Sequence, residues 1–419
     1  MNRRRFFFSA ASLAGVGAFA GWRSWPEQGI WNPCLGPLPG HLAGHDLVRA
    51  AWEGVDPNEV WDSHAHLVGI GDTPSGIRVN PKLQGVLHPF EYARREFFLN
   101  AGCAEVPGRS VDTAYVDRLV QLLEVFAPGA KMLLFAFDRT FSPGGEVDWS
   151  ETAFHVPDAY VRETAKRHPE RFEWVASIHP YRRDCVNALE AAKRDGARAV
   201  KWLPSAMGID PASERCDAFY AAAARLDLPL ISHAGLERAV AGASRQDFGN
   251  PLKLRRALNA GVRVVVAHCA SMGKDRDLDH GPDAPFVPSF ELFARMMGEP
   301  RHHGRLFGDI SALTQTHRAQ VALDRVMRST DWHARLLNGS DYPMPGLMPI
   351  FSPDYLVSAG FLEAAAAPVL TEIRRHNPLL FDFVLKRSLR ASAGRLPAAL
   401  FETRGFFDPL NSRTVRKIR

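Results

Sequence analysis

Cysteine and lysine are both scarce in this 419-residue sequence. There are five cysteines, and no two of them form a Cys-x-x-Cys pair. A chain of this length can build a large hydrophobic core, so a disulfide framework is not expected, although one bridge is possible in an oxidising compartment. Nine lysines accompany 42 arginines, which makes a lysine within an apolar stretch, such as Lys201, conspicuous.

The sequence also lacks long runs of one charge and a Gly-x-Gly-x-x-Gly motif. The formal net charge is +5, and three of the positive charges lie together at Arg3-Arg4-Arg5. The other arginines are dispersed, which argues against the basic stripe of a nucleic-acid-binding protein. Without the glycine-rich turn, nothing favours a doubly wound dinucleotide-binding sheet. We therefore expect a small-molecule substrate and no nucleic-acid partner.

The first twenty residues have the composition of an export signal. The run Arg3-Arg4-Arg5-Phe6 precedes an apolar stretch, Ser9 to Ala20, which is short and rich in Gly and Ala for a transmembrane helix. The Arg-Arg-x-Phe pattern resembles a twin-arginine signal, and Ala18-Phe19-Ala20 fits a cleavage site. We predict a signal peptide over 1–20, a periplasmic or otherwise exported location, and no stable membrane association after cleavage. An uncleaved anchor is the alternative.

After a lead-in segment at 21–57, short apolar runs alternate with amphipathic stretches. Eight runs are candidate strands: Val60–Leu67, Met132–Asp138, Glu173–His179, Ala199–Leu203, Leu230–Ala234, Val262–His268, Leu306–Ile310 and Leu336–Ser340. Apolar strands that are each followed by a helix indicate a parallel sheet covered by helices, and eight such units predict a closed (β/α)8 TIM barrel. No linker divides 58–419, so we expect one barrel domain there; an open doubly wound sheet is the alternative.

Two connections are unusually long, and the chain ends in a helical segment. Residues 68–130 separate the first two strands and predict helices near Glu91–Leu99 and Val116–Phe126. Residues 271–288 follow the sixth strand and are rich in charge and proline. Both segments follow the C-terminal ends of strands, so they should overhang the active face of the barrel. Residues 371–419 predict a helical C-terminal extension.

Metal-competent side chains stand at the ends of several predicted strands. His64 and His66 are two residues apart, so they point to the same side of the first strand and can bind one ion. His233 ends the fifth strand, His268 the sixth and Asp341 the eighth. Each of these residues alone could have no catalytic function, for example as a chance surface residue, a structural histidine or a helix cap. Because strand ends meet at the catalytic face of a barrel, their coincidence predicts a metal site.

The fourth strand carries a lysine in an apolar run. The charge of Lys201 must be met by a carboxylate of the protein or of the substrate, or removed by carbamylation so that the side chain bridges two metal ions. A snorkelling lysine is the structural alternative. Trp202, His179 and Asp309 lie at or near strand ends and are further candidate pocket residues, as is Asp138.

The ordered set resembles the amidohydrolase superfamily, and within it the amidohydrolase-2 group that includes aminocarboxymuconate semialdehyde decarboxylase. The resemblance rests on His64-Ala65-His66, Lys201, His233, His268 and Asp341. It implies that His64, His66, His233 and Asp341 bind one divalent ion, commonly zinc. It also implies that His268 acts in acid–base chemistry, with Asp341. In two-metal relatives the sixth-strand histidine is a ligand and a carbamylated fourth-strand lysine is the bridge, so Lys201 leaves a second ion open.

Three hypotheses for function follow. The first is a metal-dependent hydrolase that activates water to cleave an amide, lactone or ester bond of a small molecule. The second is a metal-dependent non-oxidative decarboxylase of a small aromatic or unsaturated acid, which the strand ends do not distinguish from the first. The third is an exported metal- or ligand-binding barrel without catalysis, against which the presence of both His268 and Asp341 argues. The sequence leaves open a homo-oligomer.

Overall fold

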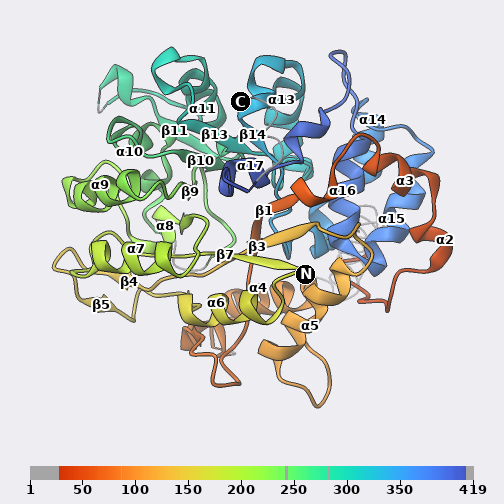
Figure 1. Cartoon of the computed structure of the whole chain (residues 1–419), viewed down its shortest axis with the longest axis horizontal. Helices are drawn as coiled ribbons and strands as arrows, with labels where there is room; N and C mark the ends of the chain where they lie inside the picture. Colours follow the sequence, from red (N-terminus) through yellow and green to blue (C-terminus); the bar gives the residue numbers. More distant parts are fainter. Residues whose placement is uncertain (1–27, 86, 241–243, 282, 412–419) are drawn as a thin grey trace, which may run out of the picture.

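The computed structural model describes residues 28–411, apart from 86, 241–243 and 282. The predicted signal peptide lies outside the described residues. Eight parallel strands form the centre of the described chain, and helices surround them (Figure 1). In chain order these strands are β1 Trp61–His66, β3 Lys131–Phe135, β7 Phe172–Val175, β8 Val200–Trp202, β9 Leu230–His233, β10 Val264–Ala267, β13 Leu306–Asp309 and β14 Leu336–Leu337.

The eight strands close into a barrel. Hydrogen bonds define a three-stranded sheet, β1-β3-β7, and a five-stranded sheet, β8-β9-β10-β13-β14. Two parallel bridges join the sheets, one between Ala176 and Val200 and one between Ala65 and Tyr342. The second bridge places the end of β14 beside β1, as a closed (β/α)8 barrel requires. The predicted fold is therefore confirmed.

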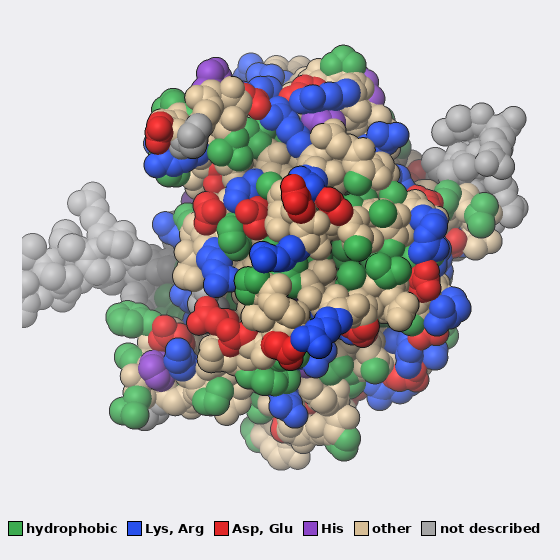
Figure 2. Space-filling view, turned by 90° about the vertical axis from the view of Figure 1, so that its left-hand side faces the viewer, with side chains coloured by type: hydrophobic (Ala, Val, Ile, Leu, Met, Phe, Trp, Pro, Cys, Tyr) green, Lys and Arg blue, Asp and Glu red, His purple; other side chains and the backbone are tan. Residues whose placement is uncertain are grey.

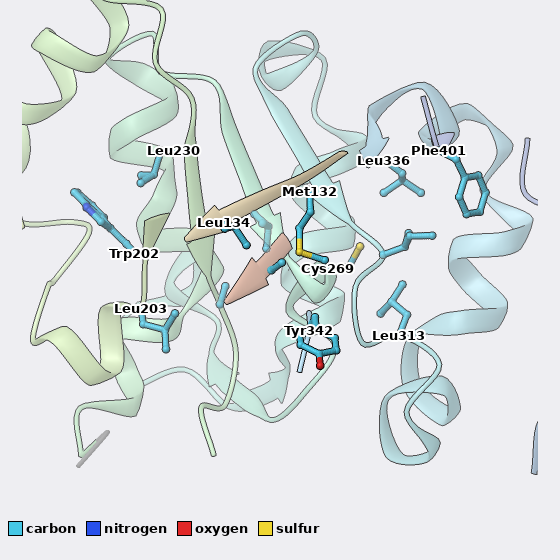
Figure 3. Packing of buried hydrophobic residues seen from close by; sticks show 14 of the residues in the cluster. Met132, Leu134, Trp202, Leu203, Leu230, Cys269, Leu313, Leu336, Tyr342 and Phe401 are labelled. Carbon is cyan, nitrogen blue, oxygen red and sulfur yellow. The ribbon is translucent and has the colours of Figure 1, made fainter. Parts of the chain in front are cut away.

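Side chains alternate between the inside of the barrel and the surrounding helices. One cluster of buried residues, which we call the barrel floor, fills the interior and consists of Trp61, Leu133, Phe135, Val175, Ala199, Ile231, Val265, Leu337 and Phe407. The alternate residues, among them Met132, Leu134 and Leu230, belong to a larger cluster with the helices (Figure 3). This period of two is the geometry of a strand buried on both faces.

The outer helices are short and follow the strands along the chain, as the alternation of apolar runs with amphipathic stretches predicts. Those beside the strands are α6 Asp158–Arg167, α7 Cys185–Arg194, α9 Asp217–Arg225, α10 Arg255–Asn259, α11 Ser289–Gly298, α12 Thr316–Arg318 and α13 Asp324–Arg328. A short helix, α8 Pro204–Met207, follows β8, and α14 Pro353–Ser358 follows β14. On the face shown in Figure 2, basic and acidic side chains are interspersed, as the dispersed charges of the sequence suggest.

Both long connections are structured. The first contains α4 Pro89–Ala101 and α5 Val111–Leu123, close to the predicted helices. Within it, β2 Arg78–Val79 pairs with β6 Phe154–His155. The second forms an antiparallel hairpin between β11 Lys274–Arg276 and β12 Phe286–Pro288. A further small hairpin pairs β4 Thr140–Phe141 with β5 Val147–Asp148.

The two ends of the described chain support the barrel. The lead-in segment contains α2 Gly40–Ala43 and α3 Asp46–Trp52, and Cys34 forms a disulfide with Cys103 beyond α4. The C-terminal extension contains α15 Ala366–His376, α16 Pro378–Ser388 and α17 Arg404–Phe407. In the described part of the chain, no helix has the length and apolar character needed to cross a membrane.

Candidate metal centre

Histidines from β1 and a carboxylate from the end of β14 meet at one point. The Nε2 atom of His64 lies 3.4 Å from Oδ1 of Asp341, and Nε2 of His66 lies 3.3 Å from the same oxygen. The strand closure fixes this contact, because the backbone N–H of Asp341 donates to the carbonyl of His64 at 2.7 Å. All three ligand atoms lie within 4.8 Å of one another. Two imidazoles and a carboxylate are a typical donor set for a divalent transition metal.

An irregularity in β1 aims the two histidines inward. The pairing of β1 with β3 shifts between Asp62 and Ala65, where β1 has one more residue than its partner. Trp61 belongs to the barrel floor, so strict alternation would send His64 and His66 outward. The extra residue reverses the alternation, and the histidines face the site instead. Bulges often re-aim side chains in this way beside functional sites.

The other ring nitrogen of His64 is held by a buried carboxylate. Nδ1 of His64 lies 2.9 Å from Oδ2 of Asp309 at the end of β13, and both side chains are fully buried. The second carboxylate oxygen of Asp309 accepts from the backbone N–H of His268 at 2.9 Å and of Ser311 at 3.0 Å. A carboxylate in this position fixes the tautomer that leaves Nε2 free as a ligand. Asp309 was predicted only as a pocket residue, and the structure places it in this orienting position.

His268 faces Asp341 from the opposite side. Its Nε2 atom lies 3.8 Å from Oδ2 of Asp341, the oxygen that is not shared with the β1 histidines. Its Nδ1 atom lies 2.7 Å from the hydroxyl of Ser311 and 3.2 Å from the carbonyl of that residue. His268, Cys269 and Ala270 all have positive φ, between 51° and 53°, so three non-glycine residues in succession are left-handed. Such a turn is costly in backbone energy and typical of functional sites.

His233 lies beside His268, at the end of β9. The centres of the two rings are 5.5 Å apart. The Nε2 atom of His233 is buried without a hydrogen-bond partner, and the oxygen Oε2 of Glu237 is 3.4 Å away in a salt-bridge contact. His233 is not within 4.8 Å of the other donors as a set. Apart from the contact with Glu237, this nitrogen has no partner among the described residues, which fits a metal ligand.

Lys201 points into the same site from β8. Its Nζ atom lies 3.2 Å from Nε2 of His64 and 5.2 Å from the centre of the Phe135 ring. Burial lowers the pKa of Lys201 to about 8, although Asp309 and Asp341 act in the opposite direction. The lysine is therefore close enough to contact a group bound at the site. Its neighbours on the strand confirm the direction, because Ala199 lies in the barrel floor.

Burial sets the protonation of the site. It lowers the pKa of His64 and of His268 well below the usual value, and it also lowers that of His233. For Asp341 burial raises the pKa, but His64, a hydrogen bond from His66 and the charge of Lys201 together bring it down to about 2. At neutral pH these three imidazoles are therefore neutral and the carboxylate is ionised, which are the forms that bind metals.

Two of the predicted pocket residues do not face the site. Trp202 alternates with Lys201, so its side chain points away from the interior (Figure 3). It packs on Phe219 of α9, with ring centres 4.5 Å apart. Its indole N–H donates to the carbonyl of Ile178 at 2.8 Å. Trp202, a candidate pocket residue from the sequence, therefore faces the helices, because the fourth strand can direct only one of two successive residues inward.

The side chain of His179 forms hydrogen bonds with backbone groups. Its Nε2 lies 3.0 Å from the carbonyl of Met207, and its Nδ1 accepts from the backbone N–H of Tyr181 at 3.1 Å. With both ring nitrogens occupied and the side chain fully buried, His179 has no nitrogen left for a substrate. In this structure His179, a candidate pocket residue from the sequence, holds the segment after β7 against α8. Asp138 has a similar function, since it accepts from the backbone N–H of His179 at 3.0 Å.

Two buried charged residues near the site were not predicted from the sequence. Glu237 follows β9 and contacts His233 as described above, and Arg318 lies in α12 and donates to Ser271 beyond His268. Both residues lie away from strand ends, whereas the other site residues were predicted from their positions at strand ends. The spacing of Glu237 four residues after His233 is the one local signal, and it is weak.

Comparisons with known proteins agree with this geometry. A family model described as amidohydrolase matches residues 61–379, so the chain belongs to the amidohydrolase family, in its amidohydrolase-2 group. It is a metal-dependent enzyme of a class that contains hydrolases and decarboxylases. No curated protein matches the sequence.

Several solved structures are similar to this chain at low identity. A TIM-barrel protein from Bordetella bronchiseptica is 16% identical, with 75% of this chain and 98% of that chain covered and a TM-score of 0.43. A putative 2-pyrone-4,6-dicarboxylic acid hydrolase from Pseudomonas putida is 15% identical, with 77% and 97% covered and a TM-score of 0.41. A 5-carboxyvanillate decarboxylase from Novosphingobium aromaticivorans, with bound manganese, is 11% identical, with 83% and 96% covered and a TM-score of 0.43.

Proposed function

We propose that this enzyme hydrolyses an amide, lactone or ester bond of a small molecule. One divalent ion, with zinc as the first candidate, would be held by His64, His66, His233 and Asp341. The observation that carries the proposal is that the two carboxylate oxygens of Asp341 have different neighbours. Oδ1 lies against the β1 histidines, and Oδ2 lies 3.8 Å from Nε2 of His268. One oxygen can therefore serve as a ligand while the other exchanges a proton with a group on the His268 side.

The residues of the chain have distinct roles in this scheme. When bound, the divalent ion supplies Lewis acidity, which polarises a carbonyl and lowers the pKa of water. Asp341 accepts the proton of the attacking water, because its carboxylate is ionised at neutral pH. His268 lies close to this carboxylate, so it can receive the proton that Asp341 takes from the water and pass it to the leaving group. Asp309 keeps His64 in the orientation that a ligand needs.

The number of ions in this scheme depends on the state of Lys201. Its Nζ atom lies 3.2 Å from Nε2 of His64, where it can contact a substrate oxygen as a free amine. Two ions would require a carbamylated Lys201 as a bridge and His268 as a ligand. Mass spectrometry of the intact protein distinguishes the two forms, since carbamylation adds one CO2 to the lysine.

Metal analysis tests the site. Protein purified without added metal should contain about one equivalent of divalent ion, and His64→Ala should lose it, whereas the exposed His303→Ala should keep it. About two equivalents would favour the bridged form. Absence of metal, even after reconstitution with zinc, manganese or iron, would remove the basis of the proposal.

Isotope labelling tests the reaction. Once a substrate panel yields turnover, hydrolysis must transfer ¹⁸O from labelled water into the product and release no CO2. His268→Asn should lower kcat by about 100-fold or more, in the range expected for loss of a general acid. Release of CO2 without incorporation of ¹⁸O would instead assign decarboxylation, the alternative that the same strand ends allow.

We also propose that the chain is exported through a twin-arginine route. The Arg3-Arg4-Arg5-Phe6 run supports the proposal, and so does the pairing of Cys34 with Cys103, since structural disulfides persist in oxidising compartments. Changing Arg3 and Arg4 together to lysine should retain the protein in the cytoplasmic fraction. An unchanged periplasmic fraction would contradict the route.

A further inference from the structure

Among the described residues, a buried arginine beside the metal centre has no acidic partner. Arg318 is 6% exposed and lies after β13, at the face of the barrel that carries the site. Its Nε atom donates to the amide oxygen of Gln315 at 3.1 Å, and its Nη1 atom donates to the hydroxyl of Ser271 at 3.1 Å. Both acceptors are neutral. Across the described residues, no carboxylate oxygen lies within salt-bridge distance of this guanidinium.

Burial without a counter-ion is unfavourable, so the arrangement needs an explanation. Moving a guanidinium out of water costs several kcal/mol unless a negative charge compensates. The charges of Asp341, Glu237 and Asp309 act on Arg318 from a distance, and none of them forms a pair with it. Each already has other partners, such as the histidines of the site. The fold therefore keeps a positive charge available near the reaction centre.

The surroundings of Arg318 add a second donor. The Nε2 atom of Gln315 is buried without a hydrogen-bond partner, although the oxygen of the same amide is bound to Arg318. The guanidinium and this amide N–H2 are thus neighbours with unused donor capacity. Arg318 also lies close enough to His233 and His268 for its charge to lower the pKa of both. A ligand that contacts Arg318 would extend toward these two histidines.

We infer that Arg318, with Gln315, binds a carboxylate group of the substrate. A guanidinium is planar and can donate two parallel hydrogen bonds to the two oxygens of a carboxylate. A neutral group lacks the negative charge that strengthens such a pair. The inference deepens the proposed function, on which it rests, by assigning an anionic substrate class. The carboxylate that Arg318 binds is one that the substrate keeps during hydrolysis. Arg318 is therefore a binding residue and takes no part in proton transfer.

Matched probes test this inference in the purified, metal-containing protein. Acetate and benzoate are each compared with their neutral amides, acetamide and benzamide, by calorimetry at constant ionic strength. The wild type should bind a carboxylate about tenfold or more tightly than its amide, as expected for a charge-assisted pair. Arg318→Met should abolish this preference, Arg318→Lys should retain part of it, and the exposed Arg328→Met should leave it unchanged.

The same measurements in the metal-free protein separate this inference from the proposed function. A preference that persists without metal and disappears in Arg318→Met supports the inference, whatever reaction the enzyme catalyses. Circular dichroism and metal content of the variants confirm that they fold and keep the site. If Arg318→Met binds both carboxylates as the wild type does, or if the wild type shows no preference in either form, the inference is wrong.

Discussion

The buried ring of His179 makes stability depend on pH in a calculable way. Burial lowers the pKa of His179 from 6.5 to about 4, although the hydrogen bond to Met207 acts in the opposite direction. The unfolded chain therefore takes up a proton on this residue below about pH 6.5, whereas the folded protein does not. Its contribution to stability is complete above pH 6.5 and is lost as the pH falls toward 4.

The size of the effect follows from the shift. With 1.36 kcal/mol for each pKa unit, the full difference corresponds to about 3 kcal/mol, of which about 2 to 3 kcal/mol should disappear between pH 7.5 and pH 4.5. No reduction for solvent screening applies, because His179 is fully buried. Glutamine can replace the donor and acceptor of the ring but does not titrate, so His179→Gln should have a flatter dependence of stability on pH.

The assay is urea unfolding at several pH values for the wild type and His179→Gln. The variant should be less stable at pH 7.5, and the gap between the two proteins should narrow by about 2 to 3 kcal/mol at pH 4.5. The exposed His303→Gln controls for the loss of one histidine. Parallel stability curves for the wild type and His179→Gln would refute the reasoning. A large loss of turnover with unchanged stability would restore His179 as a pocket residue.

Two further predictions concern the site and its backbone. Asp309→Asn should weaken metal affinity by about 10- to 100-fold, because it removes the carboxylate that orients a ligand histidine. Competition with a chromophoric chelator measures the affinity, and the exposed Asp331→Asn is the control. Equal metal affinities of Asp309→Asn and the wild type would contradict the prediction. Ala270→Gly should be at least about 1 kcal/mol more stable than Ala267→Gly in urea unfolding, because both alanines are buried but Ala270 is left-handed, with φ of 51°. Equal destabilisation by the two changes would show that the turn is not strained.

The barrel was predictable because its strands are buried on both faces. Such strands are continuous apolar runs, and a polar residue at the end of a run, such as His268 or Asp341, is easily seen against that background. The order of these residues along the chain also places them on strands that close side by side. The helices of the first long connection were predictable for a similar reason, since their apolar positions repeat with helical spacing.

The orientation of individual side chains could not be predicted in the same way. The bulge that turns His64 and His66 inward depends on the register between β1 and β3, which no local pattern encodes. Trp202 faces the helices because Lys201 faces the interior, and both are compatible with an apolar run. Arg318 comes from a helix rather than a strand end, and its contact with Ser271 is visible only in three dimensions.

The position of α17 has a consequence for the order of events during synthesis. Phe407 fills the barrel floor together with Trp61 of the first strand, and the hydroxyl of Thr403 donates to the carbonyl of Trp61. The interior is therefore incomplete until α17 has been synthesised. A nascent chain that stops before α17 exposes the floor to water and to other hydrophobic chains. Completion of the barrel interior thus comes only after all eight strands have been synthesised, and chains truncated near residue 400 should be rapidly degraded in cells.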